Sequence, residues 1–242
     1  MKIELIDIDS KVLGRNVLSL QDLVVDDNFA AEEAAYQAQF QPIYVSCRVG
    51  MENLPLIHLL ERNGFNFVEC QIKSSIRFTR QHDVSRFPYQ YQRVTSEEML
   101  SSVLDIAGKT ITHDRYTTDV NMAPGVSGTR YREYVLKSFN SASEEVWRLY
   151  DPVSGTTLAF RTHCHTAPGE VRLLLGGVHP DYKTLGLGVI SSYYCFNQML
   201  ADGIRRATTH ISAINYAVFN LEIGKLGFRV LETYAVMRKL YQ

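Results

Sequence analysis

Residues 178–188 read Val-His-Pro-Asp-Tyr-Lys-Thr-Leu-Gly-Leu-Gly and connect an apolar stretch, Val171–Val178, to a helical pattern that runs from about Leu187 to Ala201. The order predicts a strand, a glycine turn and a helix. Unpaired N–H groups and the positive dipole end make a helix amino terminus an anion site, and glycines let the anion approach the main chain. The turn is either a phosphate site or a purely geometric connection. If it binds phosphate, the contacting residues are Lys183, Thr184, Leu185, Gly186, Leu187 and Gly188.

A second segment, Asn215–Phe228, reads Asn-Tyr-Ala-Val-Phe-Asn-Leu-Glu-Ile-Gly-Lys-Leu-Gly-Phe and predicts a short amphipathic helix that ends at Gly227. Together the two segments resemble the GCN5-related N-acetyltransferases. In that family a basic residue or glutamine is followed by two residues, Gly, one residue, and Gly or Ala, a pattern that residues 183–188 match. The resemblance implies an enzyme that uses acetyl-CoA as co-substrate, binds its pyrophosphate at the glycine turn and needs no metal.

Length and composition are those of an ordinary globular protein. The chain has 242 residues, 45% of them hydrophobic, and a formal net charge of −1, which gives no general attraction to nucleic acids or acidic membranes. Its 4 cysteines are widely scattered, so we expect reduced thiols. The sequence shows no signal-peptide pattern and no stretch of membrane-spanning length. We therefore expect a cytoplasmic protein with neither a nucleic-acid nor a membrane partner; a homodimer is compatible with the sequence.

The beginning of the chain repeats part of the pattern found near its end. Strand, helix and strand patterns occupy residues 43–49, 53–65 and 67–73, and the order recurs at residues 210–213, 215–228 and 230–236. Residues 1–42 contain too little strand pattern to supply the front half of a complete copy. We therefore expect an α+β fold, an α/β/α layered mixed sheet of the acetyltransferase type. Its incomplete, structural amino-terminal half-copy would occupy residues 1–85, and its complete catalytic copy residues 86–242.

The predicted loop and helix at residues 113–134 resemble one particular group within this family. This stretch is similar to sugar-nucleotide N-acetyltransferases of the TDP-fucosamine acetyltransferase type, in which a short His/Ser-Arg-aromatic run precedes a proline-containing loop and an aromatic-rich helix. The resemblance implies a small-molecule amine acceptor, namely the amino group of a TDP- or UDP-linked amino sugar. Arg115 and Tyr116 are candidate acceptor contacts; a solvated loop arginine is the alternative for Arg115.

The resemblance also implies roles along the predicted central strand and the following helix. Backbone donors around Gly177 and Val178 would polarise the thioester carbonyl and bind the pantetheine arm, although the glycines also fit a simple bulge in a buried strand. Asn215 would contact the pantetheine amide and can cap its helix at the same time.

The sequence departs from the family at the general acid. The family pattern is Asn, five residues, Leu, Tyr; here Asn215 leads to Leu221, but Glu222 follows, and Gly227 is one residue farther away than usual. Glu222 is a candidate acid if burial raises its pKa, and Tyr216 is a second candidate. A surface glutamate, with water supplying the proton, is the alternative.

His163 and His165 occupy alternate positions of a predicted strand and share one face with Arg161, whereas Cys164 points away. Because no further ligand has a recognisable spacing, a polar strand face is favoured over a zinc site. Facing the acceptor, one of the histidines can act as general base.

Two classes of function remain open. One is an N-acetyltransferase acting on an amine, with a longer acyl-CoA or an acyl carrier protein as a variant donor. The other is a catalytically silent domain that binds acyl-CoA, which would explain the missing tyrosine.

Overall fold

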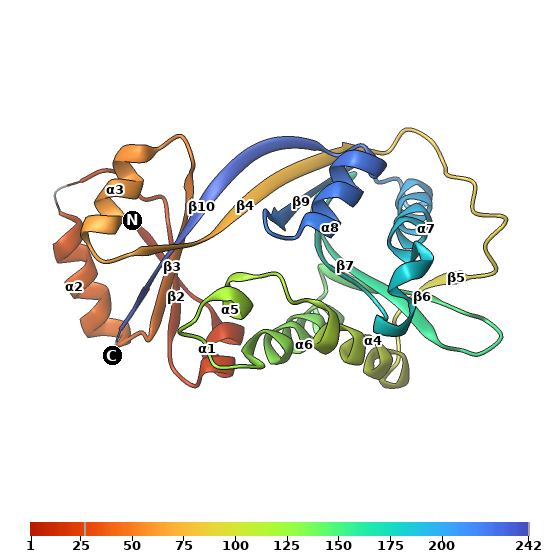
Figure 1. Ribbon diagram of the computed structural model, residues 1–242, viewed down its shortest axis with the longest axis horizontal. Coiled ribbons are helices and arrows are strands. Elements are labelled where there is room, and N and C mark those ends of the chain that lie inside the picture. The colour runs from red at the N-terminus through yellow and green to blue at the C-terminus, as the bar shows by residue number, and fades with distance from the viewer. Residues whose placement is uncertain (27, 242) are drawn as a thin grey trace.

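One ten-stranded mixed sheet runs through the whole protein in the order β1-β2-β3-β10-β4-β9-β8-β7-β6-β5 (Figure 1). The computed structural model describes residues 1–26 and 28–241, except for the side chain of Thr184. The strands are β1 (Lys2–Leu5), β2 (Val17–Gln21), β3 (Tyr44–Gly50), β4 (Asn66–Arg77), β5 (Gln90–Arg93), β6 (Glu144–Tyr150), β7 (Thr157–Ala167), β8 (Glu170–Val178), β9 (Arg206–Ser212) and β10 (Arg229–Leu240).

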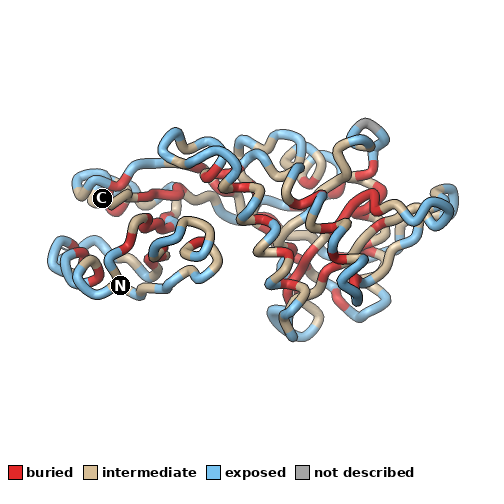
Figure 2. Tube along the Cα trace, turned by 90° about the horizontal axis from the view of Figure 1, so that it is seen from below, coloured by how far each residue is buried: buried red, intermediate tan, exposed pale blue. Residues whose placement is uncertain are grey.

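Helices cover both faces of this sheet, as predicted for a layered α+β fold. One face carries α2 (Phe29–Phe40), α3 (Leu54–Arg62), α7 (Leu187–Ala201), α8 (Tyr216–Phe219) and the π-helix η2 (Asn220–Leu226). The opposite face carries α1 (Asp7–Leu13), α4 (Glu97–Thr110), α5 (Arg115–Thr118) and α6 (Val126–Asn140). The 3-10 helix η1 (Pro180–Leu185) joins β8 to α7. Buried segments follow the strands in both halves (Figure 2).

The two halves of the chain exchange their last strands. Strand β10, from the end of the chain, lies between β3 and β4, whereas β4, from the first half, lies between β10 and β9. On one side of the β10–β4 pair, β3 is antiparallel to β10, and β2 is parallel to β3. On the other side, β9 is antiparallel to β4, and β8 is parallel to β9. The halves thus have approximate twofold symmetry within one sheet. The domain boundary at residue 85 stays a prediction. The strands of residues 1–85 need β10, and the strands of residues 86–242 need β4, to form a continuous sheet.

Residues 1–42 hold more regular structure than their sequence pattern indicates, although the incomplete amino-terminal copy stays a prediction. They form β1, the buried β2 and the helix α2. Strand β2 escaped notice because it has only 5 residues, Val-Leu-Ser-Leu-Gln, and both Val17 and Leu18 are buried, which hides the alternation of an amphipathic strand. Within the described residues, no helix is long and apolar enough to cross a membrane.

Candidate functional site

Strands β8 and β9 separate from each other along their length. Their parallel pairing covers only Glu170–Arg172 of β8 and Arg206–Thr208 of β9. Beyond these residues β8 stays paired with β7 as far as Val178, and β9 stays paired with β4 as far as Ser212. The facing edges therefore carry backbone N–H and C=O groups without a strand partner. An extended ligand can fill such a V-shaped opening as an additional strand.

The amino terminus of α7 follows the wide end of this opening. Gly186 begins the helix with a φ of 69°, a left-handed conformation that favours glycine, and among the described side chains none caps the helix. The carbonyl of Gly186 accepts hydrogen bonds from Val189 and Ile190, so the amides of Leu187 and Gly188 have no partner within the helix. A Cβ atom at Gly186 would meet no heavy atom within 4 Å, which leaves room at the turn. These amides can bind an anion.

The side chains of the predicted phosphate site differ in their surroundings. Lys183 and Leu185 are exposed on η1, whereas Leu187 is fully buried, so only its main chain can contact a ligand. The side chain of Thr184 lies outside the described part of the structure. A Cβ atom at Gly188 would lie 3.2 Å from Cδ2 of Leu221, so this glycine also permits η2 to pack against the first turn of α7.

Gly177 and Val178 lie at the far end of β8, opposite Phe160 and Ala159 of β7. A Cβ atom at Gly177 would come within 2.7 Å of both Phe160 Cε1 and Thr110 Oγ1, so close packing against α4 requires glycine here. The bulge in the β7–β8 ladder lies at Leu174, whereas Gly176 and Gly177 pair in regular register with Arg161 and Phe160, so the double glycine is not itself the bulge. Contact of the Gly177 and Val178 main chain with a ligand stays a prediction.

Asn215 begins α8, where its side-chain oxygen accepts a hydrogen bond of 3.2 Å from the Val218 amide. This is the capping role that the sequence predicts; contact with a cofactor amide stays a prediction. Tyr216, the second candidate acid, is 69% exposed on the first turn of the same helix.

Glu222 lies inside the π-helix η2 and is only 6% exposed. A π-helix accommodates one residue more than an α-helix, which accounts for the extra residue between Asn215 and Gly227. Burial raises the pKa of Glu222 to about 7, with a smaller opposing effect from the charge of Arg161. Its Oε2 atom is buried and has no hydrogen-bond partner in the described part of the chain. The alternative of a surface glutamate is therefore wrong; the role as general acid stays a prediction.

His163 and His165 face a residue that the sequence analysis missed, Glu145 of β6. Their Nε2 atoms lie 3.5 and 3.7 Å from its carboxylate, and the donor atoms of all three residues are within 4.8 Å of one another. Arg93, at 3.2 Å, and the Trp147 indole, at 2.8 Å, contact the same carboxylate. The hydrogen bond from His163 is the largest of the effects that lower the pKa of Glu145 to about 2. Only the pairing of β6 with β7 places Glu145 opposite His163, so this contact could be recognised from the structure and not from a sequence motif.

Arg115 and Tyr116 lie on the opposite face of the sheet, where they pack α5 against the amino-terminal half. Tyr116 stacks on Tyr44 with ring centroids 5.4 Å apart and donates a hydrogen bond of 2.7 Å to Asp9. The Arg115 side chain is 15% exposed and lies 3.9 Å from Glu69, so it is not a solvated loop arginine. The structure does not bring the four predicted acceptor residues together, because His163 and His165 lie beneath α7.

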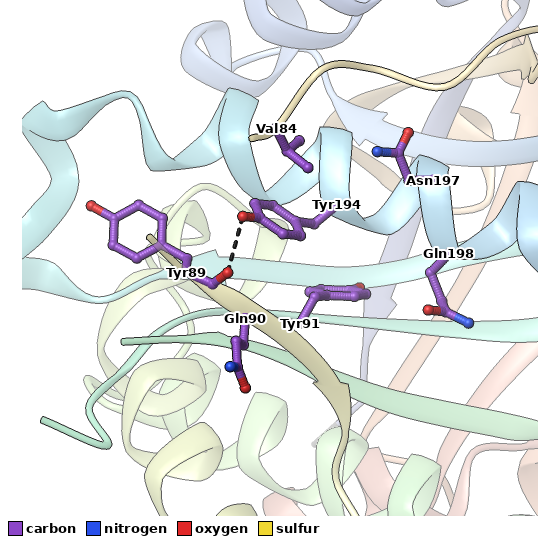
Figure 3. Close-up of a pocket in the computed structure, with 7 residues that line it drawn as sticks. All are labelled: Val84, Tyr89, Gln90, Tyr91, Tyr194, Asn197 and Gln198. Atoms are coloured by element: carbon purple, nitrogen blue, oxygen red, sulfur yellow. Dashed lines mark hydrogen bonds between the residues drawn. The ribbon is translucent and has the colours of Figure 1, made fainter. Parts of the chain in front are cut away.

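A cavity lies away from the V-shaped opening, at the edge of the sheet (Figure 3). It has a volume of about 430 Å³ and is lined by Val84, Tyr89, Gln90, Tyr91, Tyr194, Asn197 and Gln198. The Tyr194 hydroxyl donates a hydrogen bond of 3.0 Å to the Tyr89 carbonyl there. Strands β8, β7 and β6 separate this cavity from β9.

The arrangement of strands and helices is that of the GCN5-related N-acetyltransferases, and the predicted fold is confirmed. A member of that family from Sphaerobacter thermophilus superposes with a TM-score of 0.70 at 11% identity, over 98% of this chain and 76% of the other. A tandem GNAT protein from the clavulanic acid biosynthesis pathway gives 0.64 at 11% identity, over 93% and 75%. A GCN5-related N-acetyltransferase from Kribbella flavida superposes with a TM-score of 0.62 at 15% identity, over 94% of this chain and 82% of the other.

These superpositions, at 11 to 15% sequence identity, establish the fold. Comparison of the sequence with family models and with curated proteins finds no match. The tandem architecture of the clavulanic acid pathway protein accords with the two-copy arrangement seen here.

Proposed function

We propose that the protein is an N-acetyltransferase that moves an acetyl group from acetyl-CoA to a primary amine. The observation that carries this proposal is the separation of β8 from β9 directly beside the uncapped amino terminus of α7. The residues fit the co-substrate: the amides of Leu187 and Gly188 and the exposed Lys183 would hold its pyrophosphate, and the facing strand edges would hold its pantetheine arm. When bound, acetyl-CoA supplies an activated thioester.

The chain itself supplies a proton donor beneath α7. With a pKa of about 7, Glu222 is protonated in a substantial fraction of molecules at neutral pH, so its carboxyl can give a proton to a departing thiolate. Arg161, on the same side of the sheet, stabilises the carboxylate that remains. The buried position of Glu222 supports this role over the exposed Tyr216.

We further propose that the acceptor is the amino group of a nucleotide-linked amino sugar, because residues 113–134 resemble the corresponding region of sugar-nucleotide acetyltransferases. The test is release of free CoA from acetyl-CoA with a panel of TDP- and UDP-amino sugars. Release with one of them, accompanied by the N-acetylated product, is expected. Binding of CoA without release with any amine would instead identify a catalytically silent domain.

A further inference from the structure

Two exposed arginines, Arg48 of β3 and Arg172 of β8, make no ion pair within residues 1–26 and 28–241. They lie on opposite sides of the central β10–β4 pair. The nearby Lys73 differs, because it forms a salt bridge of 2.9 Å with Glu232. Arg48 and Arg172 are therefore available to bind an anion, whereas Lys73 is already paired.

Both arginines point to the same face of the sheet, away from α2, α3 and α7. Cys47 and Val49 pack into the core beneath α2 and α3, so Arg48 between them faces the other way. Val171 and Leu173 pack beneath α7, and Arg172 between them likewise faces away.

His210 of β9 belongs to the same face, because Ala207, three positions earlier on the strand, packs beneath α7 and side chains alternate between the two faces. His210 is the cross-strand partner of Lys73 in the antiparallel pair of β9 and β4.

The charges on this face act on one another. Desolvation and then the charge of Arg115 lower the pKa of Arg48; the charge of Glu69 acts against them, and the charge of Arg172 lowers this pKa by a smaller amount. Desolvation, followed by the charges of Arg48, Arg172 and Lys73, lowers the pKa of His210 to about 4, against a smaller effect of Glu232. The His210 ring also contacts Tyr234, with centroids 6.1 Å apart. An anion bound here would relieve the repulsion among these groups.

A buried polar atom without a partner lies on the same face. Gln71 of β4 is 9% exposed, and its Oε1 has no hydrogen-bond partner among the residues that the structure describes, although its Nε2 donates to Glu69 at 2.9 Å. Gln71 pairs with Ser212 of β9, and the Ser212 Oγ also lacks a partner within residues 1–26 and 28–241. Buried polar groups are normally hydrogen-bonded, so such unused capacity points to a ligand.

The position of this face relates it to the V-shaped opening. Arg172 and Thr208 are the last paired residues of β8 and β9, so Arg172 lies where the opening begins. His210 follows on the diverging part of β9. A small molecule that contacts Arg48 and Arg172 can therefore extend toward the strand edges that would hold the thioester.

We propose that Arg48, Arg172, His210 and Gln71 form an oxyanion site for the acceptor, which binds a carboxylate or phosphate group of the molecule whose amine is acetylated. Guanidinium groups bind both anions in a bidentate manner. The link to the acceptor rests on the proposed function, whereas anion binding itself does not. Arg115, which the sequence analysis named as a candidate acceptor contact, lies against Glu69 and Tyr116, so Arg48 and Arg172 are better placed to bind an anionic group.

Anion binding is tested with inorganic phosphate and with glutarate, titrated in the presence of saturating CoA and followed by the NMR signals of the His210 ring. We expect binding to raise the pKa of His210 from about 4. Arg48→Gln and Arg172→Gln should each weaken binding at least tenfold, whereas Arg62→Gln on α3 should not. Stronger binding of phosphate or of glutarate identifies the group that is recognised. Equal affinity in wild type and both variants would overturn the proposal.

Acetyl transfer gives an independent measurement with matched amines: glucosamine 1-phosphate against glucosamine, and 4-aminobutyrate against butylamine. The anionic member of at least one pair should have the higher kcat/KM. Arg48→Gln and Arg172→Gln should abolish that preference, and Arg→Lys at either position should restore part of it. A preference unchanged by these substitutions contradicts the oxyanion site while leaving the transferase intact. Absence of transfer with every amine contradicts the proposed function, and the phosphate titration then still decides the anion site.

Discussion

Arg161 of β7 donates a hydrogen bond of 2.5 Å to the hydroxyl of Ser192 in α7, and Ser192 donates one of 2.7 Å to the carbonyl of Gly188. The central strands are thereby joined to the first turn of the helix whose amides form the proposed pyrophosphate site. Arg161 also acts on the buried Glu222 through its charge. One side chain therefore links the anion site to the candidate acid.

Replacing Arg161 with Gln removes the charge that favours ionised Glu222. Because Arg161 lowers the pKa of Glu222, we expect the variant to raise that pKa above its value of about 7. A carboxyl-carbon NMR titration of Glu222 measures the change. Ser192→Ala keeps the charge of Arg161 and should shift this pKa less; a larger shift in Ser192→Ala than in Arg161→Gln would contradict the assignment.

Glu222 should make the stability of the protein fall as the pH rises. Its pKa is raised from 4.5 to about 7 by folding, so the folded state binds more protons between these values. The stabilisation is complete below pH 4.5 and is lost as the pH rises through 7, by about 3 kcal/mol at most. Urea unfolding of wild type and Glu222→Gln at pH 5 to 8 measures it. We expect the wild type to lose stability relative to Glu222→Gln across this range, and parallel pH profiles would contradict the burial of a titrating carboxyl.

The adjacent glycines 176 and 177 should respond differently to alanine. At Gly177 the added Cβ would meet Phe160 and Thr110 at 2.7 Å, whereas at Gly176 its nearest contact is 3.6 Å from Arg161. We expect Gly177→Ala to destabilise the fold by about 1–3 kcal/mol, as overpacking does, and Gly176→Ala to fold normally. Thermal unfolding compares the two, and equal stability would contradict the packing of α4 against β8.

Strand exchange should prevent either part of the chain from folding alone. Residues 1–85 would leave both edges of β4 without β10 and β9, and residues 86–242 would leave a gap between β9 and β10 where β4 belongs. We expect each fragment to be unfolded or aggregated by circular dichroism and gel filtration, and the two fragments to form a folded complex when produced together. Independent folding of residues 86–242 with native stability would contradict this dependence.

Local patterns predicted much of the fold. The helix over 187–201 and the cap at Asn215 were readable because each depends on neighbours in sequence. The exchange of β4 and β10 was not readable, because strand order depends on contacts between residues far apart in the chain. The short β2 was missed for the reasons of length and burial given above.

The candidate site was only partly predictable for the same reason. The extra residue before Gly227 was visible in the sequence. The burial of Glu222 could not be predicted from it, because that burial depends on the π-helix that the extra residue forms. Glu145 and the pair Arg48 and Arg172 carry no motif, and only the pairing of strands brings them to their neighbours. Arg115 looked like a free loop cation because its partner, Glu69, lies on a distant strand.

The most direct test of the account is a titration of the isotopically labelled protein with CoA, followed by the backbone amide signals of α7 and of the β8 and β9 edges. We predict saturable shifts at Gly186, Leu187 and Gly188, with affinity reduced at least fivefold in Lys183→Glu and unchanged in Lys2→Glu, which alters an exposed lysine on the edge strand β1. Saturable binding whose shifts lie elsewhere, or no binding at millimolar CoA, would contradict the central claim.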